Sequence, residues 1–233
     1  MVVLANKASA ETMHAVTEPL APVHFEKDGE IQGIATEIVR AIFAEAGLPV
    51  EFQIYPWNRA YQMALNSDNT FVYTINRTPQ RESLFKWIGP ILGKEVRFYK
   101  LRNRDDIEIN SFADIKKYTT AVILGHSLIE KFLDQGFREG KELITTANKR
   151  VQMKVFLKGR ADLITGNQFT ILAALQSEGY TMDDIEPAYF ISSGGYYLGA
   201  NREVSDAIVE KLNRANDKIQ HSGVVEKIIA KYM

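Results

Sequence analysis

The chain has 233 residues, of which 45% are hydrophobic and 24% charged; this is ordinary globular composition, with enough length for two lobes of about 100 residues. A formal net charge of −1 predicts no strong field for nucleic acid or an anionic membrane. The lack of cysteine excludes disulfides, thiol nucleophiles and cysteine-bound metals, and the four histidines lack zinc-site spacing, so we expect no metal or cofactor.

The start of the chain resembles the end of a secretory signal. Residues 2–5 are apolar, and Ala8-Ser9-Ala10 has the small-x-small spacing of a cleavage site. We interpret residues 1–10 as a remnant of a signal or of a cloning sequence on an exported protein, with a merely flexible N-terminus as the alternative. No apolar run approaches the roughly 18 residues of a membrane span.

The first third of the chain alternates strands and helices. Period-two and period-three-to-four patterns predict strands over 14–17, 50–55 and 71–75, helices over 34–46 and 57–65, and a hairpin turn at Asp28-Gly29. A βαβαβ order is typical of a parallel sheet, whose ligands lie beyond the carboxyl ends of the strands. We therefore expect residues 18–22, 56–57 and 74–81 to face one crevice.

Residues 74–81 form a donor-rich loop after a strand. Thr74, Asn76, Arg77 and Arg81 offer guanidinium forks, an amide and a hydroxyl within eight positions. This composition suits the binding of a carboxylate or an amino acid, although a polar surface turn has the same composition.

A second α/β set follows. Capping signals predict helices over 127–137, where Ser127 is the cap, and from Asn148 to Leu157, and a strand over 161–164 runs to Asn167. Further strands are expected near 95–101, 188–193 and 196–199, with a flexible point at Gly194-Gly195 between the last two. Two crossings between the sets, near 92–98 and 187–195, indicate a hinge.

Six motifs together resemble a known family. They are Thr17-Glu18-Pro19 with Pro22, Gly29 and Gly33 before the acidic Glu37, Thr78-Pro79-Gln80-Arg81 with Phe85, the turn over 122–127, Gly159-Arg160-Ala161-Asp162, and the ending over 223–232. In this order the chain resembles extracytoplasmic solute-binding proteins of family 3, which serve amino-acid-type ABC uptake systems; it resembles a divergent branch. The resemblance implies an α/β, two-lobed periplasmic-binding-protein-like (type II) fold with a two-strand hinge. Lobe 1 would span 11–94 and 194–233, and lobe 2 would span 95–193.

The resemblance also implies roles for individual residues. Arg81 would bind the ligand's carboxylate, Thr74 and Asn76 its polar groups, and Trp57 would cover its side chain. The backbone N–H groups of His126 and Ser127 would complete the carboxylate site, as a helix N-terminus can. Arg77 is an extra arginine that either contacts the ligand or pairs within the lobe. For each of the others a structural role is the alternative: an ion pair for Arg81, core packing for Trp57, capping for Ser127.

One departure concerns the ligand's ammonium. Family members that bind α-amino acids have an aspartate where this chain has Asn167. A buried ammonium without a counter-ion is costly. Either Glu18 supplies the charge or the ligand is not a simple α-amino acid; alternatively, Asn167 only caps a helix and Glu18 is a simple loop acid. His14, His24 and His221 are expected to be exposed or half-buried without a chemical partner.

The leading hypothesis is a soluble, monomeric periplasmic protein, not an enzyme, that captures a small carboxylate-bearing solute by hinge closure and presents it to an ABC-transporter permease. The first alternative is a ligand-sensing domain of a membrane receptor. The second is a lyase resembling cyclohexadienyl dehydratases, which would need a carboxylic acid with a raised pKa; Glu18 keeps this alternative open.

Overall fold

The computed structural model of the chain describes residues 12–124 and 127–232, and the chain divides into two compact units. Unit 1 runs to Gly93 and resumes at Gly195, and unit 2 is Lys94–Gly194. The chain passes between the units within two long strands, β6 (Lys86–Leu101) and β10 (Ile185–Ala200), which are neighbours in the strand order.

Unit 1 is built on the strand order β4-β1-β5-β10, with β1 parallel to β4 and β5. Besides its parts of β6 and β10, its elements are β1 (Met13–Thr17), β2 (Phe25–Lys27), β3 (Glu30–Gln32), α1 (Ile34–Glu45), β4 (Val50–Ile54), α2 (Trp57–Asn66), β5 (Thr70–Ile75), α6 (Asp206–Gln220) and α7 (Val224–Tyr232). Asp28 and Gly29, both with positive φ, make the predicted turn between β2 and β3.

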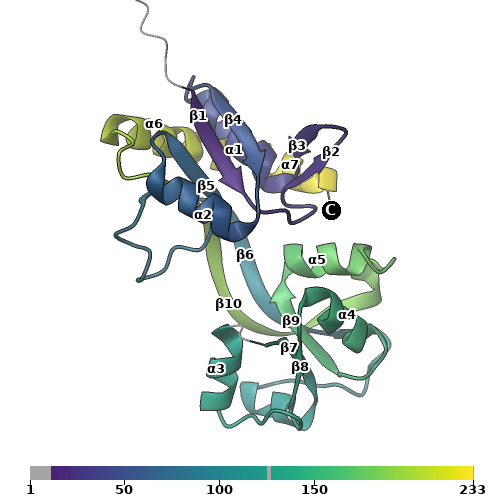
Figure 1. Cartoon of the computed structure of the whole chain (residues 1–233). Coiled ribbons are helices and arrows are strands. Elements are labelled where there is room, and N and C mark those ends of the chain that lie inside the picture. Colours follow the sequence, from purple (N-terminus) through teal and green to yellow (C-terminus); the bar gives the residue numbers. More distant parts are fainter. Residues whose placement is uncertain (1–11, 125–126, 233) are drawn as a thin grey trace, which may run out of the picture. The chain divides into compact units, whose positions relative to one another are not determined.

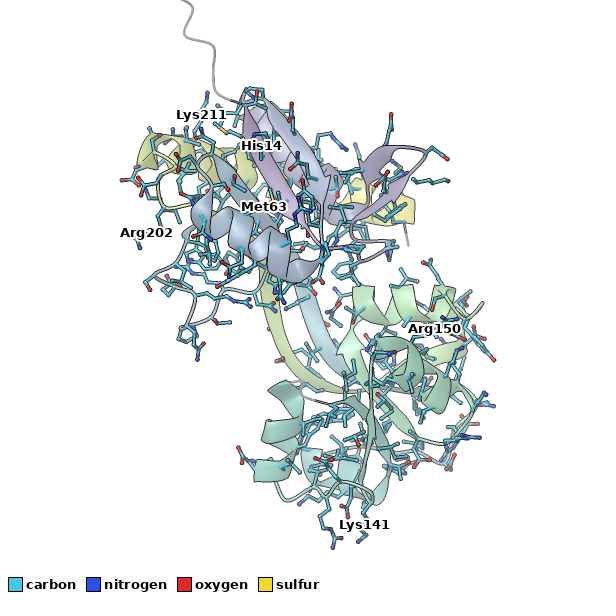
Figure 2. The ribbon with its side chains drawn as sticks, viewed as in Figure 1. His14, Met63, Lys141, Arg150, Arg202 and Lys211 are labelled. Carbon is cyan, nitrogen blue, oxygen red and sulfur yellow. The ribbon has the colours of Figure 1, made fainter. Side chains whose placement is uncertain are left out.

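Helices cover both faces of this sheet because alternate side chains of a strand point to opposite faces. Val16 and Val72 pack with Ala60 and Ala64 of α2 in one core cluster. Phe71, one position away from Val72, packs edge-on against Phe43 of α1. In Figure 1, α2 lies on one face of the strands β1 and β5, and α1 lies on the opposite face. Met63, which Figure 2 labels, is a residue of α2.

Unit 2 has the strand order β6-β9-β7-β8, with β7 parallel to β8 and β9 and with β6 antiparallel to β9. Its elements are η1 (Phe112–Lys117), β7 (Thr120–Ile123), α3 (Ser127–Asp134), β8 (Leu143–Thr146), α4 (Lys149–Leu157), β9 (Leu163–Asn167), α5 (Gln168–Gln176) and η2 (Met182–Asp184). Phe98 of β6 packs with η1 and α3, and the next residue, Tyr99, packs with α4 and α5, so this sheet is also covered on both faces.

The predicted α/β fold class, with mixed sheets flanked by helices, is confirmed. The predicted break at Gly194-Gly195 is wrong, because β10 continues through both glycines. A Cβ on Gly195 would lie 2.6 Å from Cβ of Pro90, so glycine is needed there for close approach rather than for flexibility. The helix predicted over 127–137 ends earlier, at Asp134, where Gly136 with φ of 78° makes the C-terminal turn.

Candidate functional site

Unit 1 brings three of the predicted segments to one edge of its sheet. Because β1, β4 and β5 are parallel, their carboxyl ends at Thr17, Ile54 and Ile75 lie at the same edge. Glu18 follows β1 directly, Trp57 begins α2 immediately after Pro56 in the connection from β4, and the 76–81 loop follows β5. The edge therefore gathers acidic, aromatic and cationic side chains, as the sequence predicts.

Arg81 is half-buried and lies over aromatic rings of α2. Its guanidinium carbon is 5.6 Å from the ring centroid of Trp57 and 5.3 Å from that of Tyr61, and its Nη1 donates to the carbonyl of Asn76 at 3.3 Å. Within the described residues no carboxylate forms an ion pair with Arg81. The guanidinium is thus held in place by aromatic faces and one carbonyl, with donors left for an anion.

Arg77 has a different environment. Its Nε and Nη2 donate to the two carboxylate oxygens of Glu82 at 2.8 and 2.5 Å. Its guanidinium carbon also lies 5.6 Å from the ring centroid of Trp87 and 5.7 Å from that of Tyr197. This bidentate pair uses the fork that a ligand carboxylate would need, so the geometry favours the structural role for Arg77.

A hydrogen-bond network of two hydroxyl groups and an imidazole lies at the end of β5, just before the 76–81 loop. Thr74, with φ of 62°, has its Oγ1 3.1 Å from Oγ1 of Thr17 and 2.9 Å from Nε2 of His24. Thr17 Oγ1 donates to the carbonyl of Tyr73 at 3.1 Å. The network fixes the end of β5 against β1, and a left-handed Thr is tolerated because its side chain is held on two sides.

The expectation for His24 is wrong. The residue is 1% exposed, bonds to Thr74 and lies edge-on to Tyr73 at 5.7 Å between centroids. Burial lowers the pKa of His24 to about 4, so the imidazole is neutral at neutral pH. Sequence reasoning missed it because an isolated histidine after Pro22-Val23 carries no signal of a partner 50 residues away.

Glu18 is half-buried at the same edge. Burial raises the pKa of its carboxyl group, and that group makes no ion pair with any residue in the described ranges. Such a carboxylate is stabilised by an arriving cation, which is the role that the sequence suggests for it.

Unit 2 gathers its own set of residues in the same way. The parallel strands β7, β8 and β9 end at Ile123, Thr146 and Asn167 along one edge. Ser127 begins α3 and Asn148 caps α4, with Oδ1 accepting from the N–H of Val151 at 3.1 Å. His126 lies outside the described residues.

Asn167 caps α5. It is 8% exposed, and its Oδ1 accepts from the N–H groups of Phe169 and Thr170, both at 3.1 Å. The capping alternative is thereby observed, and contact with a ligand stays a prediction.

Lys149, the first residue of α4, is at this edge but was missed from the sequence. Its Nζ donates to the carbonyl of Thr165 at 3.0 Å and to Oε1 of Gln152 at 2.9 Å. Burial around the amino group lowers the pKa of Lys149 to about 8. Its position in the sequence could have indicated it, because Lys149 directly follows the helix cap Asn148 after a predicted parallel strand.

A hollow of about 850 Å³ lies on unit 1 among α1, α7, the β2–β3 hairpin and β4. Its charged groups bind each other: Lys231 pairs with Glu37 at 2.7 Å, and Arg40 Nη2 donates to the carbonyl of Ile31 at 2.9 Å. Tyr232 also bonds to Glu37 and accepts from the N–H of Gly33. These contacts fasten α7 to the start of α1, which is a structural role.

Within residues 12–124 and 127–232, no group of three or more His, Asp or Glu side chains could hold a metal ion. None of the helices in those ranges combines the length and apolar character that crossing a lipid bilayer requires.

Known proteins resemble this chain along nearly its whole length. A probable amino-acid ABC transporter-binding protein of Haemophilus influenzae is 21% identical over 216 residues, covering 89% of this chain and 79% of the relative. The second substrate-binding domain of GlnP from Lactococcus lactis superposes with a TM-score of 0.78 at 16% identity, covering 97% and 96%. A histidine kinase sensor domain superposes with a TM-score of 0.70 at 17% identity, covering 96% of each chain.

Those structural likenesses concern the fold. Membership is shown by the family model of bacterial extracellular solute-binding proteins, family 3, which matches residues 13–233. The resemblance inferred from the six sequence motifs is confirmed, and the chain belongs to the bacterial extracellular solute-binding proteins of family 3.

Proposed function

We propose that this protein is the binding component of an ABC-type uptake system and captures a small solute that carries a carboxylate, an amino acid or a related compound. The observation that carries the proposal is Arg81. Its guanidinium is held over Trp57 and Tyr61 at the strand-end edge of unit 1 and is not paired with a carboxylate of the described residues. A planar fork in this setting suits bidentate binding of a carboxylate.

The neighbouring residues of unit 1 complete this role. Trp57 offers an aromatic face beside the bound carboxylate, and Asn76 and Thr74 supply polar groups at the end of β5. Glu18 is the candidate for pairing with a cationic group of the ligand. Arg77 stabilises the loop through Glu82 and is not proposed as a ligand contact.

Residues of unit 2 contribute as well. The backbone N–H groups of Ser127, the first residue of α3, and of His126, which precedes it in the sequence, are proposed to donate to the ligand. Asn167 Oδ1 already accepts two backbone N–H groups, so its contact with a ligand would come from the amide nitrogen.

We further infer that the protein is exported and acts as a monomer that delivers its solute to a membrane permease. The curated relatives favour uptake over sensing, because the H. influenzae relative is named a probable amino-acid ABC transporter-binding protein and a Bacillus subtilis relative a probable amino-acid-binding protein. Binding without turnover is proposed; measurable conversion of prephenate or arogenate would overturn it in favour of a lyase.

A thermal-shift screen with amino acids, organic acids, polyamines and peptides tests the proposal. A ligand at 100 times its dissociation constant should stabilise the protein by about 2.7 kcal/mol. Arg81→Ala should remove the shift given by carboxylates, and Arg77→Ala is the matched control, since it deletes an arginine from the same loop. If Arg81→Ala keeps the shift, or if only ligands without a carboxylate bind, the proposed site is wrong.

A further inference from the structure

Thr74 is the extra residue of a β-bulge at the end of β5. Where β5 pairs with β10, Tyr73 lies opposite Leu198 and Ile75 lies opposite the adjacent residue, Tyr197. Thr74 therefore has no counterpart of its own on β10. Its φ of 62° is left-handed, a conformation that glycine adopts readily and that a β-branched residue rarely adopts. A bulge of this kind usually has glycine at the left-handed position, and it redirects the chain that follows.

We propose that His24 is a positioning residue for the ligand site. By holding the side chain of Thr74, it keeps the bulge left-handed, and the bulge in turn places the guanidinium of Arg81. This inference rests on the proposed function, in which Arg81 binds the carboxylate of the solute. His24 itself is 1% exposed, so it acts through Thr74 and not by contact with the solute.

The hydroxyl group of Thr74 is held from three directions. It donates to the carbonyl of Tyr73 at 2.5 Å, and its Oγ1 lies 3.1 Å from Oγ1 of Thr17 and 2.9 Å from Nε2 of His24. Thr17 ends β1, which is the neighbour of β5 in the sheet (Figure 1). Because a hydroxyl has a single proton to donate, and Thr74 gives it to the carbonyl, Nε2 of His24 is the donor toward Thr74. The neutral imidazole therefore carries its proton on Nε2.

His24 can hold Thr74 because its own position is fixed. The N–H of Leu20 donates to the carbonyl of His24 at 2.8 Å, and the N–H of His24 donates to the carbonyl of Leu20 at 3.0 Å. The preceding residue, Val23, accepts from the N–H of Ala35 in the first turn of α1 at 2.9 Å. The imidazole also lies edge-on to the ring of Tyr73. The segment that carries the donor is thus fastened to both α1 and β5.

The bulge sets the position of Arg81 through Asn76. The carbonyl of Asn76, two residues after Thr74, accepts from Nη1 of Arg81 at 3.3 Å. The N–H of Arg81 donates to the carbonyl of Thr78 at 2.9 Å, which closes the turn between them. A change in the backbone angles of Thr74 would move this carbonyl, and with it the guanidinium that now lies over the ring of Trp57.

A purely structural role for His24 is the competing explanation. If the imidazole only fills space in unit 1, its loss lowers stability but leaves Arg81 in place in the folded protein. Two substitutions of Thr74 separate the explanations, because both remove the hydroxyl group and differ by one methyl group. Only glycine adopts the left-handed conformation without support. Positioning therefore predicts that Arg81 leaves Trp57 in Thr74→Ala and stays in Thr74→Gly.

The test is acrylamide quenching of Trp57 emission in the whole protein. Trp87→Phe is the background, since it leaves Trp57 as the only tryptophan. Arg81→Ala uncovers the ring and sets the upper limit of the quenching constant. His24→Leu and Thr74→Ala should raise the constant at least halfway to this limit. Thr74→Gly should keep the background value, and so should the double variant with His24→Leu and Thr74→Gly, because glycine no longer needs the imidazole.

Two further variants act as controls. His24→Gln should keep the background value, because its amide nitrogen can donate to Thr74 as the imidazole does. Thr36→Val removes another buried hydrogen bond of unit 1, in which Oγ1 of Thr36 lies 3.0 Å from the hydroxyl oxygen of Tyr73, and it should also leave the constant unchanged. The two Thr74 variants decide the question even if His24→Leu does not fold.

The outcomes separate this inference from the proposed function, because the quenching measurement uses no solute. A constant that stays unchanged in Thr74→Ala, or that rises equally in Thr74→Ala and Thr74→Gly, overturns the positioning role and leaves the Arg81 site standing. A constant that stays unchanged in Arg81→Ala also overturns it. If the constants follow the expectation but Arg81→Ala keeps the thermal shift given by amino acids and organic acids, the carboxylate site is wrong and the placement of Arg81 by His24 stands.

Discussion

The guanidinium carbon of Arg81 lies 5.6 Å from the ring centroid of Trp57, and the two residues come from different segments that meet at the carboxyl edge of the unit 1 sheet. The aromatic face positions the cation without neutralising it. A cation held in this way keeps its donors for a ligand, whereas Arg77, bound to Glu82, does not.

This relationship makes Trp57 a reporter of binding. The chain contains two tryptophans, Trp57 and Trp87. We expect a carboxylate ligand to change the emission of wild type and of Trp87→Phe, and to leave that of Trp57→Phe unaffected. Trp57→Ala should also weaken binding by roughly 10-fold or more, as the loss of about 1.4 kcal/mol predicts. Ligand-dependent emission that persists in Trp57→Phe would contradict this placement.

His24 should make stability depend on pH. Its pKa is about 4 in the fold and near 6.5 when unfolded, so between these values the unfolded chain binds the extra proton. The contribution of His24 to stability is therefore complete above pH 6.5 and is lost as pH falls toward 4, and it amounts to on the order of 3 kcal/mol. Urea unfolding from pH 4 to 7 measures it.

His24→Gln, which has no titrating group, should unfold with a weaker pH dependence over this interval, and His221→Gln is the control because His221 is exposed. Equal slopes for wild type and His24→Gln would show that the imidazole is not buried in the neutral form.

Much of this arrangement follows from the sequence and some of it does not. The βαβαβ order, the caps at Asn148 and Asn167 and the gathering of residues at the strand ends are local or topological, so periodicity and capping rules suffice to predict them. The burial of His24 depends on Thr74, and the partners of Lys149 depend on Thr165 and Gln152. Contacts between residues so far apart leave no local pattern.

Gly195 is a similar case, because composition suggests flexibility where packing requires a small residue. Gly195→Ala would place a methyl group 2.6 Å from Cβ of Pro90, and the strained strand should cost roughly 1–3 kcal/mol. Gly194→Ala is the matched control, since the nearest atom to a Cβ there is Cε of Lys94 at 3.9 Å. Thermal unfolding of the two variants should differ by several degrees, and equal midpoints would contradict the packing argument.

Lys149 should make stability rise with pH in the alkaline range, the same direction that a carboxylate with a lowered pKa gives at acidic pH. Its pKa is about 8 in the fold and 10.5 as the reference value, so the unfolded chain holds the extra proton between these values. Unfolding free energy should rise with pH from 8 toward 10.5 through this group, by on the order of 3 kcal/mol. Lys149→Met should remove the rise, and Lys158→Met should keep it.

Asn167→Asp tests how the chain treats an ammonium group. The new carboxylate can still accept the N–H groups of Phe169 and Thr170, so the cap of α5 is retained and the ligand-free melting temperature should change little. The added negative charge should favour ligands that carry an ammonium, because a charged hydrogen bond replaces a neutral one. Affinity for L-glutamate relative to glutarate should therefore increase about tenfold, equivalent to about 1.4 kcal/mol.

Asn167→Ala controls for the loss of the cap and should destabilise the protein by about 1 kcal/mol without changing that ratio of affinities. An unchanged ratio in Asn167→Asp would place the ligand's amino group away from the end of β9 and leave Glu18 as its partner.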